Sequence, residues 1–173
     1  NQVIYQTVQL VSFLKNTTVN PNLEEAVKIA NERGIDLVKK YEDEGWTIEK
    51  VAEYALEVLK ISKEYPRDGK ISFDDMVWLP VVNNWITPRF DLVVIDECQD
   101  MNVLQLTIAT GACKPGGRSV LLGDDKQDIY GFRGALQNSI SVFKERLKAI
   151  EFTHTTTFRC PIKIVNFVQG IVP

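Results

Sequence analysis

The sequence has few of the residues that build metal centres and disulfide frameworks. Its 173 residues include one histidine and three cysteines, and Cys98, Cys113 and Cys160 lie far apart without a CxxC spacing. Structural zinc sites need four cysteine or histidine ligands at short spacings, and a disulfide framework has an even number of cysteines. The sequence therefore argues against both and predicts free thiols in a reducing, cytoplasmic compartment.

Long apolar runs and a strong net charge are also missing. No apolar stretch approaches the ~20 residues that cross a bilayer, and the N-terminal residues lack the basic and apolar regions of a signal peptide. We therefore expect no membrane partner. The formal net charge is −3, which argues against coating nucleic acid through bulk charge but allows a local binding groove.

The chain divides into two regions of different character. Residues 1–88 are highly charged and helical in pattern, with helix starts predicted at Asn22, Thr47 and Ser72 because these side chains favour the N-cap position. Gly34 is expected to stop the first of these helices, and Pro80 to end or kink the third. Residues 1–88 are thus predicted to form a mostly helical subdomain.

Residues 89–173 alternate apolar strands with amphipathic helices, which predicts an α/β fold. Apart from Asp91, the run 90–95 is apolar, and Val93, Val94 and Ile95 are β-branched, as in a strand buried on both faces. A helix over 102–112, a turn at Gly116–Gly117 and a strand over 119–122 would complete a βαβ unit with parallel strands. Further predicted elements are a helix over 135–148 and a strand over 151–158. Cys160 and Pro161 are expected to open a last helix, with Pro161 at its first helical position and a buried face of Ile164, Phe167, Val168 and Ile171.

Both predicted buried strands run directly into acidic segments. The first is followed by Asp96-Glu97-Cys98-Gln99-Asp100 and the second by Gly123-Asp124-Asp125-Lys126-Gln127. Ligands of open parallel sheets bind beyond the carboxyl ends of the strands. Mg²⁺ with a phosphate chain needs one or two carboxylates, and a second acid can deprotonate a water. The alternative is that the acidic residues only cap the next helix.

A longer pattern favours the first reading. It comprises residues 96–100, the string Gly123-Asp124-Asp125-Lys126-Gln127-Asp128-Ile129-Tyr130-Gly131-Phe132-Arg133-Gly134-Ala135, and residues 157–160. These three pieces resemble motifs II, III and IV of the UvrD/Rep/PcrA-type superfamily 1 DNA helicases, and Lys126 is more typical of the RecB and AddA branch. The resemblance implies a partial P-loop NTPase (RecA-like) parallel sheet flanked by helices, with residues 1–88 as an inserted helical subdomain.

The resemblance also implies a role for each matching residue at an ATP site. Asp96 would hold Mg²⁺, and Glu97 would be the general base that activates the attacking water. Gln127 would contact the γ-phosphate of ATP. Arg159 would stabilise charge on that phosphate as an arginine finger does. Phe158 would stack on the adenine, where the family usually has tyrosine.

On the DNA side, the resemblance implies that Tyr130 and Phe132 meet single-stranded DNA. Phe132 would stack on a base, an interaction that tolerates any sequence. Arg133 would either pair with a DNA phosphate or brace the loop. Because Gln127 and Phe132 lie on one short loop, that loop would contact both the nucleotide and the DNA, as coupling of hydrolysis to movement requires.

The sequence lacks the P-loop pattern G-x-x-x-x-G-K-[ST] of this family. Gly69-Lys70-Ile71-Ser72 does not supply it, because Glu64 stands where the first glycine belongs and Ser72 is one place late. We therefore expect a piece of the motor that starts after the P-loop, stops early in the second half and does not hydrolyse ATP alone. An incomplete sheet would expose an edge and favour self-association.

Two functions from different classes follow from these observations. The first is an ATP-dependent DNA helicase or translocase, using ATP and Mg²⁺ and acting on single-stranded or duplex DNA. The second is a non-catalytic module, derived from a helicase, that binds single strands or a partner protein. A superfamily 2 RNA helicase is disfavoured by the string over 127–135.

Overall fold

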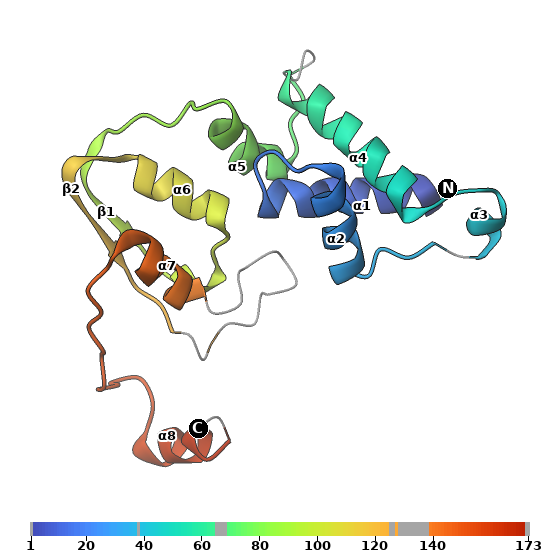
Figure 1. Cartoon of the computed structure of the whole chain (residues 1–173). Coiled ribbons are helices and arrows are strands. Elements are labelled where there is room, and N and C mark those ends of the chain that lie inside the picture. Colours follow the sequence, from blue (N-terminus) through green and yellow to red (C-terminus); the bar gives the residue numbers. More distant parts are fainter. Residues whose placement is uncertain (1, 38, 65–68, 125–126, 128–138, 172–173) are drawn as a thin grey trace.

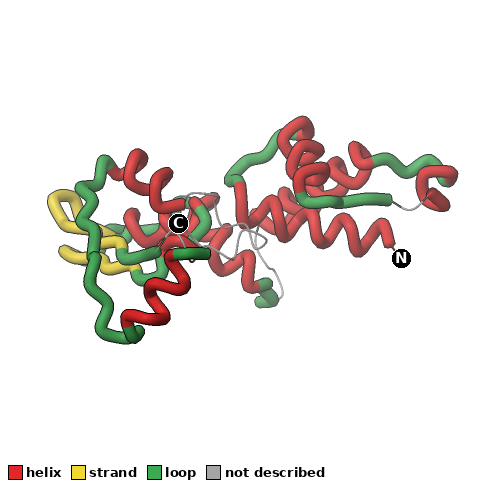
Figure 2. Tube along the Cα trace, turned by 90° about the horizontal axis from the view of Figure 1, so that it is seen from below, coloured by secondary structure: helices red, strands yellow, loops and turns green. Residues whose placement is uncertain are grey.

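The computed structural model describes residues 2–37, 39–64, 69–124, 127 and 139–171. A helical part comes first, made of α1 (Gln2–Thr17), α2 (Leu23–Glu32), α3 (Lys39–Asp43), α4 (Ile48–Lys63) and α5 (Phe73–Val82). An α/β part follows, made of β1 (Phe90–Ile95), the 3-10 turn η1 (Cys98–Asp100), α6 (Val103–Gly111), β2 (Cys113–Leu121), α7 (Ser139–Leu147) and α8 (Ile162–Gln169). Figures 1 and 2 show the strands at one end of the molecule and the first helices at the other.

The predicted helix starts are confirmed. The side chains of Asn22 and Thr47 each accept a hydrogen bond from a backbone N–H in the first turn of α2 and α4. Ser72 and Asp75 form a reciprocal capping box at the start of α5, which satisfies two backbone donors that the helix cannot. Gly34 follows α2 with φ +66°, a conformation that glycine adopts without strain.

Pro80 does not end α5. The helix continues through Val82, and the backbone N–H of Asn83 still donates to the carbonyl of Leu79. Trp78 and Val82 are only 2% and 8% exposed, so burial of the final turn outweighs the one helical hydrogen bond that a proline removes.

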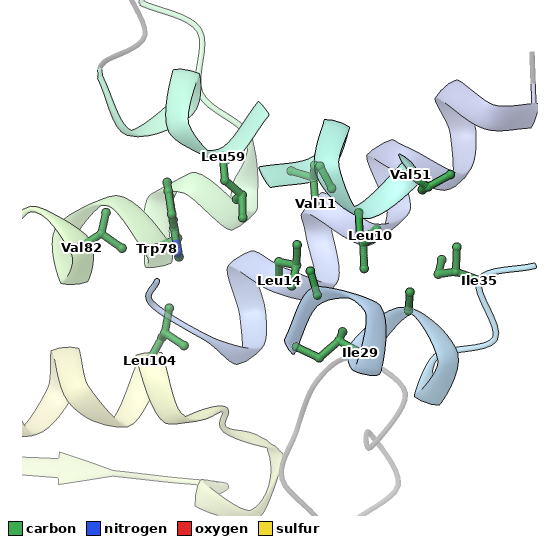
Figure 3. Close-up of a cluster of buried hydrophobic side chains, with 14 of the residues drawn as sticks. Leu10, Val11, Leu14, Ile29, Ile35, Val51, Leu59, Trp78, Val82 and Leu104 are labelled. Carbon is green, nitrogen blue, oxygen red and sulfur yellow. The ribbon is translucent and has the colours of Figure 1, made fainter. Parts of the chain in front are cut away.

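The main hydrophobic core lies around α1. Leu10 and Leu14 of α1 are fully buried, and α4 and α5 add Val51 and Trp78 to the same cluster. Figure 3 shows that Leu104, from α6, points into this cluster from the side of the sheet. Helix α6 therefore packs against the helical part. It also packs against the strands, since its Leu106 belongs to a second core with Ile95 and Phe143.

The predicted βαβ unit is confirmed. Strands β1 and β2 pair in parallel, and α6 connects them. The register runs from Leu92 opposite Arg118 to Ile95 opposite Leu121, whereas Phe90 lies opposite Cys113. Strand β2 thus begins earlier than predicted and carries extra residues in its first half. The turn predicted at Gly116–Gly117 falls in this irregular stretch, where Gly116 has φ +80°.

The prediction that β1 is buried on both faces is wrong. Ile95 is 7% exposed, but Leu92 and Val94 are 55% and 56% exposed. Helices α6 and α7 contribute to the core that contains Ile95. In the parts of the chain that the structure describes, no element buries Leu92 and Val94.

Three predictions near the C-terminus are also wrong. Residues 151–158 form no strand, because a strand needs a partner for its backbone and none of the described strands lies beside this segment. The apolar residues of α8 are exposed rather than buried, including Phe167 at 69%, and Figure 1 shows α8 standing apart from the sheet. Pro161 is the N-cap of α8 and not its first helical residue.

The helix predicted over 135–148 is described as α7 from Ser139 to Leu147. Residues 128–138, including its expected first turn, lie outside the described residues. None of the described helices is long and apolar enough to cross a membrane.

Candidate functional site

The two acidic residues of the candidate site follow β1 directly. Asp96 and Glu97 are both exposed. Glu97 has φ 52° and ψ 43°, a left-handed conformation that is uncommon outside glycine and is often found at functional sites. Its backbone N–H donates to Oδ1 of Asp96 at 3.0 Å. The sharp turn after β1 therefore holds the two carboxylates at the carboxyl end of the sheet.

Backbone hydrogen bonds join this turn to the end of β2. The N–H of Leu122 donates to the carbonyl of Ile95 at 2.8 Å, and the N–H of Cys98 donates to the carbonyl of Leu122 at 2.9 Å. These bonds continue the strand pairing beyond the last residues of β1 and β2. They bring the acidic segment 96–100 beside the segment that begins at Gly123.

Gln99 lies between the two segments and contacts both. Its side chain is buried, and its Nε2 donates to Oε2 of Glu97 at 2.7 Å. Its Oε1 accepts from the backbone N–H of Asp124 at 3.1 Å. Ser139, at the start of α7, donates its hydroxyl to the carbonyl of Gln99 at 2.9 Å. Sequence reasoning missed this residue, although an amide beside two acids in the 96–100 segment was the available signal.

Gln127 extends the same chain of hydrogen bonds. Its Nε2 donates to Oδ2 of Asp124 at 2.7 Å, and its backbone N–H donates to the carbonyl of Asp124 at 3.1 Å. Hydrogen bonds thus link four residues one after another: Glu97, Gln99, Asp124 and Gln127. The structure places three of the residues singled out from the sequence, Asp96, Glu97 and Gln127, at one end of the sheet.

Phe158 and Arg159 are not brought to this place. Phe158 is 92% exposed, and the backbone N–H of Arg159 donates to the hydroxyl of Thr157 within its own segment. Figure 1 shows the orange-red stretch between α7 and α8 leading away from the sheet. Tyr130, Phe132 and Arg133 lie outside the described residues.

The donor set at Asp96 fits Mg²⁺ carried by a phosphate chain. Among the described residues, no three His, Cys, Asp or Glu side chains are grouped so that they could hold a metal ion without further ligands. A magnesium ion bound with phosphates needs only one or two carboxylates and keeps several waters. One exposed carboxylate at Asp96, with Glu97 next to it, meets that need.

Cys98 stands in the same turn and is buried, with 2% of its surface exposed. Burial raises the pKa of its thiol, and the charges of Asp96 and Glu97 raise it further. Cys98 therefore stays protonated and packs as a small side chain in the core that contains Ile95. All three cysteines are free.

Comparison with known proteins gives the class of the chain. A family model described as the UvrD/REP helicase N-terminal domain matches residues 3–148. The chain therefore belongs to the UvrD/REP helicase family, through its N-terminal domain.

Individual relatives agree with this assignment. The chain is 29% identical to DNA helicase II of Haemophilus influenzae over 93 residues, which cover 54% of this chain and 13% of the relative. It is 26% identical to the ATP-dependent DNA helicase PcrA of Staphylococcus aureus over 119 residues, covering 64% and 16%.

A third relative is the putative ATP-dependent DNA helicase YjcD of Bacillus subtilis, 30% identical over 133 residues that cover 69% of this chain and 18% of the relative. The chain thus spans less than a fifth of the length of each of these three proteins. No solved structure matches.

Proposed function

We propose that this chain is part of an ATP-dependent DNA motor that couples ATP hydrolysis to movement on single-stranded DNA. The observation that carries the proposal is the hydrogen-bonded series from Glu97 through Gln99 and Asp124 to Gln127. It links a carboxylate suited to activating water with an amide suited to contacting phosphate, at the end of a parallel sheet where ligands bind. Family membership supports the same reading.

Each residue of the series has a chemical task in this proposal. Asp96 would hold Mg²⁺, whose charge offsets the negative charge of the phosphates when it is bound. Glu97 would accept the proton of the attacking water. Because Gln99 occupies Oε2 of Glu97, Oε1 is the oxygen that would face the water. Gln127 would donate from its amide to the γ-phosphate in place of its bond to Asp124.

The DNA side of the proposal rests on the residues that follow Gln127. Tyr130 and Phe132 would contact single-stranded DNA, with Phe132 stacking on a base, and Arg133 would pair with a DNA phosphate or brace the loop. Only a few residues separate them from Gln127 in the chain. Loss of the γ-phosphate at Gln127 would therefore change the position of the DNA-contacting residues.

Phe158 and Arg159 complete the proposed ATP site. Phe158 would stack on adenine and Arg159 would stabilise charge on the γ-phosphate. Both side chains are exposed. Their proposed roles require the segment between α7 and α8 to approach the end of the sheet when nucleotide binds.

The test is ATPase activity of the complete reading frame that contains this chain, with and without single-stranded DNA. We expect DNA to stimulate the rate, and Glu97→Gln to lower kcat by about 10²–10⁴-fold, the contribution of a general base. Asp91→Asn is the matched control, because Asp91 is an exposed acid on β1, the strand that precedes Glu97, and is paired with Lys114, so its loss should leave kcat unchanged. A wild-type protein without ATPase activity that still binds single strands would instead support the non-catalytic module.

A further inference from the structure

We propose that Gln99 is a positioning residue that makes the placement of Glu97 depend on what Gln127 contacts. This inference rests on the proposed function, because it assumes that Glu97 is the general base and that Gln127 meets the γ-phosphate. It adds a residue to which the resemblance gave no role. Gln99 touches neither nucleotide nor water in this proposal and acts only through Glu97 and Asp124.

The two ends of the Gln99 amide are chemically matched to different partners. The partner at 2.7 Å is Oε2 of Glu97, which in its ionised form can only accept, so the amide nitrogen must face it. The partner at 3.1 Å is the backbone N–H of Asp124, which can only donate, so the amide oxygen must face it. Glutamine satisfies both partners at once. Glutamate lacks the donor, and methionine lacks both functions.

The surroundings of Gln99 leave the amide little freedom. Gln99 is 2% exposed, and the Ser139 hydroxyl donates a hydrogen bond to its backbone carbonyl. Gly123 approaches so closely that a Cβ there would lie 2.8 Å from Oε1 of Gln99 and 2.6 Å from Sγ of Cys98. Rotation of the amide would leave buried polar groups without partners, which costs about 1–3 kcal/mol per group. Gln99 and Asp124 are therefore expected to move together.

A displacement at Gln127 would travel along this series. Gln127 holds the Asp124 carboxylate through Nε2 and the Asp124 carbonyl through its backbone N–H. When Nε2 of Gln127 donates to a phosphate oxygen, the carboxylate of Asp124 loses its hydrogen bond from Gln127. Asp124 then shifts, and the hydrogen bond from its backbone N–H to Gln99 shifts with it. Through its hydrogen bond to Oε2 of Glu97, Gln99 would then change the position of the Glu97 carboxylate. The general base would be placed for attack only while the γ-phosphate is present.

The first experiment compares Gln99→Met with the wild type in the complete protein, measuring kcat and KM for ATP together with ADP affinity. We expect kcat to fall about 10–100-fold, as when outer partners of a reacting group are lost, with KM and ADP affinity changed less than about twofold. Ser139→Ala is the matched control. It removes the bond to the backbone of the same buried residue and leaves the amide in place, so thermal stability should drop without a comparable loss in kcat.

A second variant of Gln99 and a double variant give two further checks of this inference. Gln99→Glu keeps the size of the side chain and the acceptor for Asp124 but loses the donor to Glu97, and we expect a similar loss in kcat. Gln127→Ala combined with Gln99→Met should be little slower than the slower single variant, because both changes break one series.

An active wild-type protein in which both Gln99 variants keep kcat within twofold would overturn this inference alone. Losses in kcat that multiply in the double variant would overturn it as well, because they would show that Gln99 and Gln127 act independently. A wild-type protein that shows no DNA-stimulated ATPase would overturn the proposed function, and this inference with it.

Discussion

The side-chain amide of Asn102 donates to Oδ1 of Asn16 at 3.1 Å, although 86 positions separate the two residues. Asn102 caps α6, the helix that follows the acidic segment 96–100, and Asn16 lies in the last turn of α1. Asn16 also donates to Oδ1 of Asp74 in α5 at 2.8 Å. The acidic segment is thus tied at its far end to the helical part of the molecule.

The first prediction concerns this connection. Asn16→Ala should lower the free energy of unfolding by about 1–3 kcal/mol, because it removes the hydrogen bonds to Nδ2 of Asn102, a residue that is 4% exposed, and to Oδ1 of Asp74. Urea unfolding of the chain, followed by circular dichroism, measures the change. Asn20→Ala is the control, since Asn20 is exposed and accepts only a long bond from Lys63 at 3.4 Å. Equal midpoints for the two variants would contradict the prediction.

A second polar contact lies inside the helical part. Nζ of Lys15, in α1, lies 2.6 Å from Oδ1 of Asp75, in α5, and their side chains are 6% and 13% exposed. Burial acts to raise the pKa of Asp75, but hydrogen bonds from Lys15 and Ser72 and the charge of Lys15 outweigh it, so the pKa of Asp75 is lowered from its usual value. The ionised form is therefore favoured by folding.

The second prediction follows from the sign of that shift. A folded-state pKa below the unfolded value of about 3.9 contributes stability that is complete above about pH 5 and is lost as the pH falls through the folded-state pKa. Asp75→Asn should therefore destabilise the chain more at pH 6 than near pH 3.

Thermal unfolding of the wild type and the variant at both pH values measures the difference. Asp91→Asn, which removes an exposed ion pair with Lys114, should have little effect at either pH. A penalty for Asp75→Asn that stays the same at pH 3 would contradict the assignment.

The sequence predicted local features well because neighbouring residues determine them. The caps at Asn22, Thr47 and Ser72 depend on a side chain and an N–H three positions away. Helix α1 was harder to find, since it has no acidic residue in its first turn. The sequence left open whether Pro80 ends or kinks α5, because burial of Trp78 and Val82 decides that the helix continues, and burial depends on distant helices.

The candidate site shows the same division. That Asp96 and Gln127 lie at one end of the sheet follows from the parallel pairing of two strands, which the pattern of apolar runs indicates. The role of Gln99 could not be predicted, because it depends on an N–H of Asp124, 25 positions further along the chain. Burial of Leu92 and of α8 was wrongly expected, because an apolar pattern does not show which element covers it.

The third prediction concerns the close approach at Gly123. A Cβ at this position would lie 2.6 Å from Sγ of Cys98 and 2.8 Å from Oε1 of Gln99, and both neighbours are only 2% exposed. Because neither can move aside freely, Gly123→Ala should lower the free energy of unfolding by about 1–3 kcal/mol, as overpacking of a core does. It should also separate Asp124 from Gln99, so that the amide proton of Asp124 exchanges faster with solvent.

Urea unfolding and hydrogen exchange followed by NMR measure the two effects at Gly123. Gly170→Ala is the matched control, because a Cβ there would approach no atom closer than 3.4 Å. Unchanged exchange at Asp124 in Gly123→Ala would show that the loop tolerates a side chain. The contact between Gln99 and Asp124 would then not depend on the glycine.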